Sequence, residues 1–274
     1  MQTPEPMDNP YLELTDEFNE GRIRALISSG QAVVVYRLAI MSKDGDWVLR
    51  EDEEATSHVL EVLARRGARY RFGAPLDPRW LAGGWSAHFE LWEAGLRLRT
   101  DFVTRPPRVS DERLEQMWRD TAVSGREVVD LEPLTALKMT RREKDYAVIG
   151  ELARRLSDPR SQLLYSRSSR DLIRLAREHP EALAETLPER PLLARIPEGR
   201  DALDEALDRE RRALMRADEE RLARFRAAAE EWSSLWPRVA REIEDLQLPE
   251  AHRVVTSRAE NVLPFEPPSG RGVP

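Results

Sequence analysis

The chain has 274 residues and a mass of 31.6 kDa, of which 41% are hydrophobic and 34% charged, enough for one large domain or two modest ones. Its 43 basic and 50 acidic side chains give a net charge of −7, which argues against a protein that coats nucleic acid, and the lack of cysteine excludes disulfides, thiolate metal sites and cysteine nucleophiles. No apolar run reaches the ~20 residues that span a bilayer, and the acidic N-terminus is unlike a signal peptide, so we expect a soluble, cytoplasmic protein without a membrane partner.

The first half of the chain, after an N-terminal extension over residues 1–21, has a mixed pattern of strands and helices. A helix over Glu51–Arg66 keeps its apolar residues on one face and has Gly67 in the C-cap position. The first strand is expected from a near-continuous apolar run and the fourth from strict alternation of apolar and polar residues. The predicted strands are, in order, Ala32–Ala39, Asp46–Leu49, Ala68–Phe72, Ser86–Trp92 and Leu96–Val103.

The second half reads almost entirely as helix, and a helix capped by Ser110 opens it. Apolar residues in the last helical stretch are spaced by three and four, which predicts a seam for packing on another helix, in a second copy or a partner protein. Pro237 interrupts this seam, so two helices or one kinked helix are expected there. The proline-rich segment 249–274 is expected to be a flexible tail. The later helices are predicted from Pro133, over Lys144–Leu156, over Ser168–Glu178 and over Asp201–Asp245.

Three aspartates are candidate metal ligands. Asp44 and Asp46, two residues apart at the start of a strand, project from the same face of a sheet, and Asp101 lies on the polar face of Leu96–Val103. Three converging carboxylates supply oxygen ligands for Mg²⁺ or Mn²⁺, and their mutual repulsion favours a cation between them. The plainer interpretation is that Asp44-Gly45-Asp46 is turn chemistry and that Asp101 pairs with Arg97 or Arg99.

The order of elements around these acids resembles the nucleotidyltransferase superfamily of the DNA polymerase β type, most closely the bacterial enzymes of abortive-infection and toxin–antitoxin systems. The resemblance covers Ala25 to Leu156 and rests on the segments SKDGDWVLREDEEATSHVLEVLARRGARY, LRLRTDFV and VVDLEPLTALKMTRREKDYAVIGELARRL. It implies an α+β fold, with a small mixed sheet flanked by helices over residues 22–156 and a helical domain over 157–248. It also implies that Asp44, Asp46 and Asp101 are catalytic residues that hold Mg²⁺ or Mn²⁺, that an NTP is the substrate and that a protein or RNA is the acceptor.

Other candidate site residues follow from the same resemblance. Lys138 would touch the nucleotide phosphates, and Asp145, with Arg99, would support the site. The plainer interpretations are a solvated helix lysine and an acid that stabilises a helix dipole. The superfamily's Gly-Gly or Gly-Ser motif, whose backbone amides approach the triphosphate, is not found in Val35–Met41. Nucleotide binding would then fall to three neighbouring side chains, those of Arg37, Ser42 and Lys43.

The four histidines are well separated, so neither a metal triad nor a nucleophile–base pair is expected, and His88 is the one that merits a test. Two functions stay open. The first is a metal-dependent nucleotidyltransferase. The second is a catalytically inactive module of the same fold that binds a nucleotide or a protein, which the missing Gly-Ser motif and the aromatic residues Trp232 and Trp236 favour.

Overall fold

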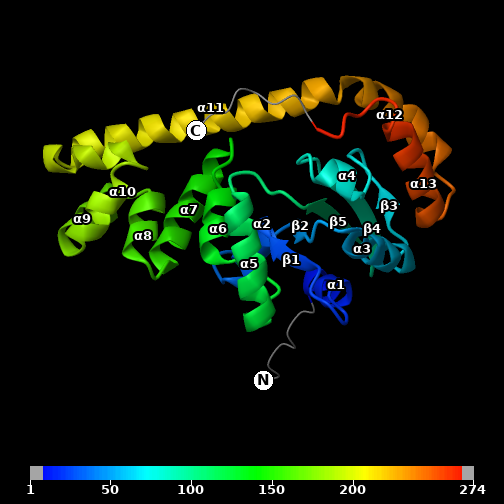
Figure 1. Cartoon of the computed structure of the whole chain (residues 1–274), viewed down its shortest axis with the longest axis horizontal. Coiled ribbons are helices and arrows are strands. Elements are labelled where there is room, and N and C mark those ends of the chain that lie inside the picture. The colour runs from blue at the N-terminus through cyan, green and yellow to red at the C-terminus, as the bar shows by residue number, and fades with distance from the viewer. Residues whose placement is uncertain (1–8, 267–274) are drawn as a thin grey trace. The chain divides into compact units, whose positions relative to one another are not determined.

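The computed structural model describes residues 9–266 and divides into two compact units, of which the second comprises Asp130–Ala223 and the first comprises the remainder (Figure 1). The first unit is a five-stranded mixed sheet with helices, and the second is helical, so the predicted α+β class is confirmed. The unit boundaries fall at Val129 and Ala223, whereas the domain limits drawn from the sequence fall at residues 156 and 248.

The sheet has the strand order β1-β2-β5-β4-β3. The pair β2–β5 is parallel and the other pairs are antiparallel. Ala94 and Gly95, both with positive φ, make the tight turn between β4 and β5, as the predicted hairpin requires. The strands are β1 (Ala25–Ser28), β2 (Asp44–Leu49), β3 (Arg69–Tyr70), β4 (Ala87–Glu93) and β5 (Leu96–Val103).

Several helices of the first unit begin at residues whose side chains cap free backbone amides. Asn9 accepts a hydrogen bond from Tyr11 N–H at the start of α1, and Asp52 accepts one from Ala55 N–H at the start of α3. Gly67, in the left-handed region, follows α3 as the sequence predicts. The helices are α1 (Pro10–Phe18), α2 (Ser29–Val35), α3 (Glu53–Arg65), α4 (Pro78–Leu81), α5 (Asp111–Ser124), α12 (Glu230–Glu242) and α13 (Leu248–Ala259), with the end of α11 (Arg200–Ala228).

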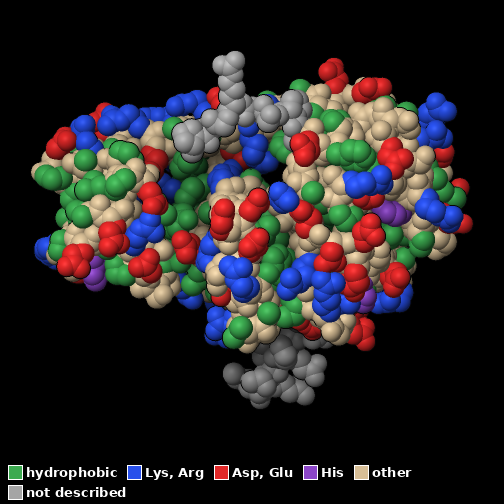
Figure 2. All heavy atoms as spheres, viewed as in Figure 1, with side chains coloured by type: hydrophobic (Ala, Val, Ile, Leu, Met, Phe, Trp, Pro, Cys, Tyr) green, Lys and Arg blue, Asp and Glu red, His purple; other side chains and the backbone are tan. Residues whose placement is uncertain are grey.

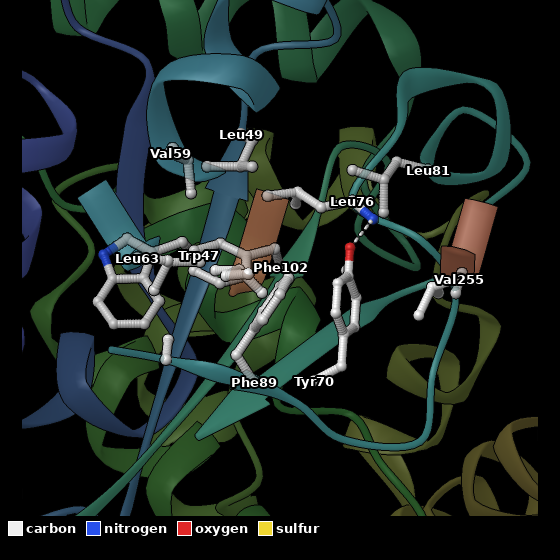
Figure 3. Close-up of a cluster of buried hydrophobic side chains, with 14 of the residues drawn as sticks. Trp47, Leu49, Val59, Leu63, Tyr70, Leu76, Leu81, Phe89, Phe102 and Val255 are labelled. Atoms are coloured by element: carbon white, nitrogen blue, oxygen red, sulfur yellow. Dashed lines mark hydrogen bonds between the residues drawn. The ribbon is translucent and has the colours of Figure 1, made fainter. Parts of the chain in front are cut away.

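The core of the first unit lies on one face of the sheet and is rich in aromatic rings (Figure 3). Trp47 of β2 stacks on Phe102 of β5, and Phe18 of α1 meets both rings edge-on. The hydroxyl of Tyr70 accepts a hydrogen bond from Leu76 N–H at 3.1 Å, drawn as the dashed line in Figure 3. Aromatic packing therefore fixes the strands that carry the polar residues of the opposite face.

The second unit packs short helices around the leucines Leu163, Leu172, Leu175, Leu193, Leu203 and Leu207. A buried ion pair accompanies this core: Arg190 donates to both carboxylate oxygens of Glu210 at 3.0 and 2.8 Å, and Arg167 also bonds Glu210. The helices are α6 (Leu131–Leu137), α7 (Glu143–Arg155), α8 (Pro159–Tyr165), α9 (Ser169–Glu178), α10 (Pro180–Thr186), a 3₁₀ helix (Pro191–Glu198) and most of α11.

Three sequence predictions need correction. The apolar run Ala32–Ala39 is not a strand: its first part belongs to α2, and the strand is Ala25–Ser28, because a short apolar run does not distinguish a buried strand from a buried helix. Segment 249–274 is not all tail, since α13 occupies most of its first half and buries Val255 in the core; residues 267–274 lie outside the described residues. The break in the last long helix is at Ala229, and Pro237 lies within α12.

The predicted docking seam is used within the first unit. Trp232, Val239 and Ile243 are buried in the core shared with the sheet, and Trp236 meets Phe72 edge-on at a centroid distance of 5.9 Å.

On the molecular face that Figure 2 draws, acidic and basic side chains are interspersed rather than gathered by sign. Over residues 9–266, no helix has the length and apolar character needed to cross a membrane.

Candidate functional site

A row of polar residues crosses the whole sheet on the face opposite the aromatic core. Asp46 of β2 lies opposite Ser28 of β1 on one side and opposite Asp101 of β5 on the other. Asp101 in turn lies opposite His88 of β4, whose carbonyl accepts the backbone N–H of Arg71 at 2.9 Å. Five chain segments therefore bring one polar residue each to the same row.

The two-residue period of strands explains why this face is polar. In β2 and β5, buried Trp47 and Phe102 point into the core, and the residues before them point to the other side of the sheet. Asp44, which lies opposite Arg99, shares the face of Asp46 and Asp101. The strand register therefore places all three aspartates on the same face of the sheet.

The Asp101 carboxylate makes two polar contacts, and both go to Oδ1. The Nδ1 atom of His88 lies 2.6 Å from it, and Nη1 of Arg71 lies 3.2 Å from it. Among residues 9–266, Oδ2 of Asp101 has no hydrogen-bond partner, and the side chain is 25% exposed. The ion pair of Asp101 is thus with Arg71, whereas Arg97 pairs with Glu90.

Asp44 is more exposed than Asp101. The Asp44 side chain is 44% exposed and lies 3.9 Å from Nη1 of Arg99, while its Oδ1 atom is covered and has no hydrogen bond within the described part of the chain. Asp46 is half-buried. The charges of these acids reach Tyr11, whose pKa is raised first by burial and then by the negative field of Asp44, Asp46 and Asp101.

A small-residue turn lies beside Asp46, and the sequence analysis missed it. β1 ends at Ser28, Ser29 has a φ of 49°, and α2 begins there. A Cβ atom at Gly30 would overlap the Ser42 side chain, so any larger residue there would require Ser42 to move. The turn was overlooked because the first strand was placed at Ala32–Ala39; the Ser-Ser-Gly sequence itself was the available signal.

The other predicted phosphate contacts near the sheet lie at different places. Ser42 packs over Gly30, and its carbonyl accepts a hydrogen bond from Gln31 Nε2 at 3.0 Å. Lys43 is exposed and its carbonyl accepts the Tyr11 hydroxyl at 2.7 Å. Arg37 is exposed, has a φ of 57° and closes the far end of α2, away from the Ser28–Gly30 turn. Nucleotide contacts by these three residues stay predictions.

Lys138 and Asp145 belong to the second unit. Lys138 follows α6 and is 6% exposed, so the interpretation of a solvated helix lysine is wrong. Asp145, in the first turn of α7, accepts hydrogen bonds from Thr140 Oγ1 at 2.6 Å and from Arg142 Nε at 2.8 Å. Asp145 therefore braces the connection between α6 and α7, and the nucleotide-site roles of both residues stay predictions.

A serine directly before β4 and a histidine within it are hydrogen-bond partners. Ser86 Oγ lies 2.8 Å from Nε2 of His88, and the other ring nitrogen of His88 is bonded to Asp101. The two residues are two apart along the strand, so they share the polar face. The sequence analysis considered only the wide spacing of the four histidines, whereas strand alternation places Ser86 beside His88.

Metal-ligand geometry is not preformed on this face. Within residues 9–266, no group of three or more histidine, aspartate or glutamate side chains is gathered as a metal-binding cluster. The donor types nevertheless suit Mg²⁺ or Mn²⁺, since all three aspartates offer carboxylate oxygens and two of those oxygens have no hydrogen bond in the described chain.

Comparisons with known proteins give one structural similarity. No family model matches the sequence, and no curated protein matches it. The fold is similar to a crystal structure of a candidate nucleotidyltransferase from H. pylori, at 10% sequence identity and a TM-score of 0.36, over 77% of this chain and 96% of that chain. A functional conclusion must therefore come from the residues of this chain.

Proposed function

We propose that the polar face of the sheet binds a nucleoside triphosphate together with Mg²⁺ or Mn²⁺ and transfers a nucleotide to an acceptor hydroxyl. The observation that carries the proposal is the direct pairing of Asp46 with Asp101 in the parallel ladder, with Asp44 on the same face. Adjacent carboxylates repel each other, and a divalent cation relieves that repulsion. The resemblance of the Asp-x-Asp strand and the acid-bearing strand to nucleotidyltransferases agrees with this use.

The three aspartates would hold the metal. Oδ2 of Asp101 and Oδ1 of Asp44 are the oxygens whose hydrogen-bonding capacity is unused among the described residues. A divalent ion bound there supplies charge neutralisation for the triphosphate and the leaving pyrophosphate. Arg99, beside Asp44, would balance the excess negative charge when the site is empty of cation.

The phosphates would lie against the Ser28–Gly30 turn. Ser28 is the ladder neighbour of Asp46, and the backbone reverses there with a positive φ at Ser29. Backbone amides and hydroxyls of such a turn suit phosphate oxygens, and the absence of a side chain at Gly30 lets the chain pack closely. This turn fills the role that the sequence analysis sought in Val35–Met41.

A second candidate function is nucleotide binding without turnover. The specific observation in its favour is that Arg71 and His88 both occupy Oδ1 of Asp101. If the positive charge of Arg71 keeps a cation away from Oδ2 of Asp101, the face would bind a nucleotide without the three-carboxylate centre that transfer requires.

The test measures metal binding, nucleotide binding and transfer on the same set of proteins. Calorimetry measures the binding of Mn²⁺ and of a non-hydrolysable NTP. An NTP labelled at the α-phosphate reports transfer of the nucleotide to added protein or RNA. Variants are Asp44→Asn with Asp46→Asn, and Asp101→Asn. Asp111→Asn is the matched control, because Asp111 is 73% exposed and lies in α5 rather than on the sheet.

The proposal predicts that the wild type and Asp111→Asn bind Mn²⁺ and transfer label, and that the other two variants lose transfer by at least about a hundredfold. Binding of the NTP without transfer in the wild type supports the second candidate. Equal behaviour of all four proteins excludes a role for the three aspartates.

A further inference from the structure

A continuous chain of hydrogen bonds links a serine to the candidate metal ligand on β5. Ser86 Oγ lies 2.8 Å from His88 Nε2, and His88 Nδ1 lies 2.6 Å from Asp101 Oδ1. All three side chains are on the polar face of the sheet, where His88 and Asp101 are each 25% exposed and Ser86 is half-buried. The chain of bonds is therefore open to a ligand bound on that face.

The acceptor capacity of Asp101 fixes the direction of these bonds. An ionised carboxylate only accepts hydrogen bonds, so Nδ1 of His88 carries the proton that it donates to Oδ1. In the neutral ring, Nε2 then has a lone pair, and the Ser86 hydroxyl donates to it. Ser86 Oγ, the His88 ring and the Asp101 carboxylate thus lie in the serine–histidine–aspartate order of an activated nucleophile.

The backbone around Gly73 holds the His88 ring in this orientation. A Cβ atom at Gly73 would lie 2.5 Å from Cδ2 of His88 and 2.9 Å from the carbonyl oxygen of Ser86. Trp232 Nε1 donates to the carbonyl of Gly73 at 2.9 Å, and Ala74 N–H donates to that of Ser86 at 2.9 Å. The segment of residues 71–74 that follows β3 therefore runs beside the ring and leaves no room for a side chain at Gly73.

We propose that Ser86 is an acceptor of the nucleotidyl group, so that the protein modifies itself. This inference rests on the proposed function, because Asp101 serves both sites: it is the ladder neighbour of Asp46 and the hydrogen-bond partner of His88. A nucleotide held by the aspartates would present its α-phosphorus to the face on which Ser86 Oγ lies.

The step transfers the nucleotidyl group to Ser86 and the serine proton to His88. The Oγ–H bond of Ser86 breaks and its proton moves to Nε2 of His88, while Oγ forms a bond to the α-phosphorus. The bond between that phosphorus and the bridging oxygen of the β-phosphate breaks, and pyrophosphate leaves with the electron pair. The product is a serine phosphodiester that carries the nucleoside, and no oxidant or further reactant is needed.

The experiment uses the full chain with Mg²⁺ or Mn²⁺ and each of the four ribonucleoside triphosphates. Intact-protein mass spectrometry detects a nucleoside monophosphate adduct, and peptide sequencing locates it. The variants are Ser86→Ala, Ser86→Thr, which keeps a hydroxyl, and His88→Asn; Ser57→Ala, an exposed serine of α3, is the matched control. Circular dichroism of each variant confirms folding, and calorimetry with a non-hydrolysable NTP measures nucleotide binding separately.

We expect one adduct per chain on Ser86 in the wild type, in Ser57→Ala and, on the new hydroxyl, in Ser86→Thr. Ser86→Ala loses the adduct but still binds the NTP, and His88→Asn forms the adduct at least about a hundredfold more slowly. NTP binding, or transfer to an added acceptor, without an adduct on Ser86 overturns this inference and leaves the proposed function standing. No NTP binding and no adduct overturns both.

Discussion

Trp47 stacks on Phe102 with ring centroids 5.3 Å apart and an interplanar angle of 19°. The two residues are ladder partners, and each directly follows an aspartate of the polar row. A slip of one residue in this pairing would turn the aromatic rings toward solvent and the aspartates into the core. The stack therefore fixes the register that sets Asp46 beside Asp101.

Removing the Trp47 ring is expected to destabilise the first unit strongly. Trp47 is fully buried, and its indole N–H donates to Thr15 Oγ1 at 2.9 Å. Trp47→Ala should lower the free energy of unfolding by about 3–5 kcal/mol, as for other buried tryptophans. The control is Trp92→Ala, since Trp92 is 54% exposed and its loss should change stability by only about 0.5 kcal/mol. Urea unfolding of both variants gives the comparison, and equal losses would contradict the assigned role of the stack.

Two glycine-to-alanine changes are expected to act in opposite directions. At Gly150 in α7, an added Cβ meets no atom within 4 Å, so Gly150→Ala should raise the free energy of unfolding by about 0.5–1 kcal/mol through helix propensity. At Gly73 the Cβ would overlap the His88 ring, so Gly73→Ala should lower the free energy of unfolding by about 1–3 kcal/mol. Thermal and urea unfolding measure both, and a neutral Gly73→Ala would show that the ring has room to move.

Removing the arginine beside Asp101 is expected to tighten metal binding. Arg71 lies 3.2 Å from Oδ1 of Asp101, so its positive charge opposes a cation held by the same carboxylate. Arg71→Ala should lower the dissociation constant for Mn²⁺ roughly fivefold, which corresponds to an interaction of about 1 kcal/mol at a partly exposed site. Arg69→Ala, an exposed arginine on β3 without a described acidic partner, should leave it unchanged. Calorimetry gives the dissociation constant for Mn²⁺ in each variant. An unchanged Mn²⁺ affinity in both variants would count against Asp101 as a ligand.

The buried ion pair of the second unit is expected to make stability depend on acid pH. Burial alone would raise the pKa of Glu210, but the hydrogen bonds and positive charges of Arg190 and Arg167 hold it below the ordinary value of 4.5. A lowered pKa in the folded state stabilises the fold fully above the unfolded-state pKa, and this stabilisation is lost as pH falls below about 4.5.

Glu210→Gln should therefore cost about 3–5 kcal/mol at pH 7, because two arginines lose their buried partner, and the cost should shrink toward pH 4. Glu205→Gln is the matched control, since Glu205 lies in the same helix and is 66% exposed. Urea unfolding at pH 7, 5 and 4 provides the measurement. A cost that does not change with pH would show that the charge of Glu210 is not what stabilises the unit.

Much of the fold is visible in the sequence because several elements carry strong local signals. The alternating pattern of Leu96–Val103 and the glycine of the preceding turn define β5, and Ser110 caps α5 where expected. The failures have a common cause. Short apolar segments such as Ala32–Ala39 lack the length that separates helix from strand, so α2 was taken for a strand. Likewise α13 begins beside Pro249, which suits the first turn of a helix as well as a tail.

The candidate site was only partly predictable for a different reason. Spacing along one strand placed Asp44 with Asp46, because side-chain alternation is a local property. Pairing between strands is set by tertiary packing, so the contacts of Asp101 with Arg71 and His88 had no sequence signature. The Ser86–His88 pair did have a sequence signature, since a serine and a histidine two residues apart in a predicted strand share a face.

The β1 edge of the sheet is closed by the chain itself. The backbone of Ile27 bonds to Glu127 and Val129 at 2.9 Å, so residues 127–129 occupy the hydrogen-bonding groups that a free edge would offer. An extended peptide thus has no strand to extend on this side of the row that carries Ser28 and Asp46. A macromolecule that approaches the sheet from the β1 edge can therefore be recognised only through side chains. Point substitutions of those side chains would change which molecule binds.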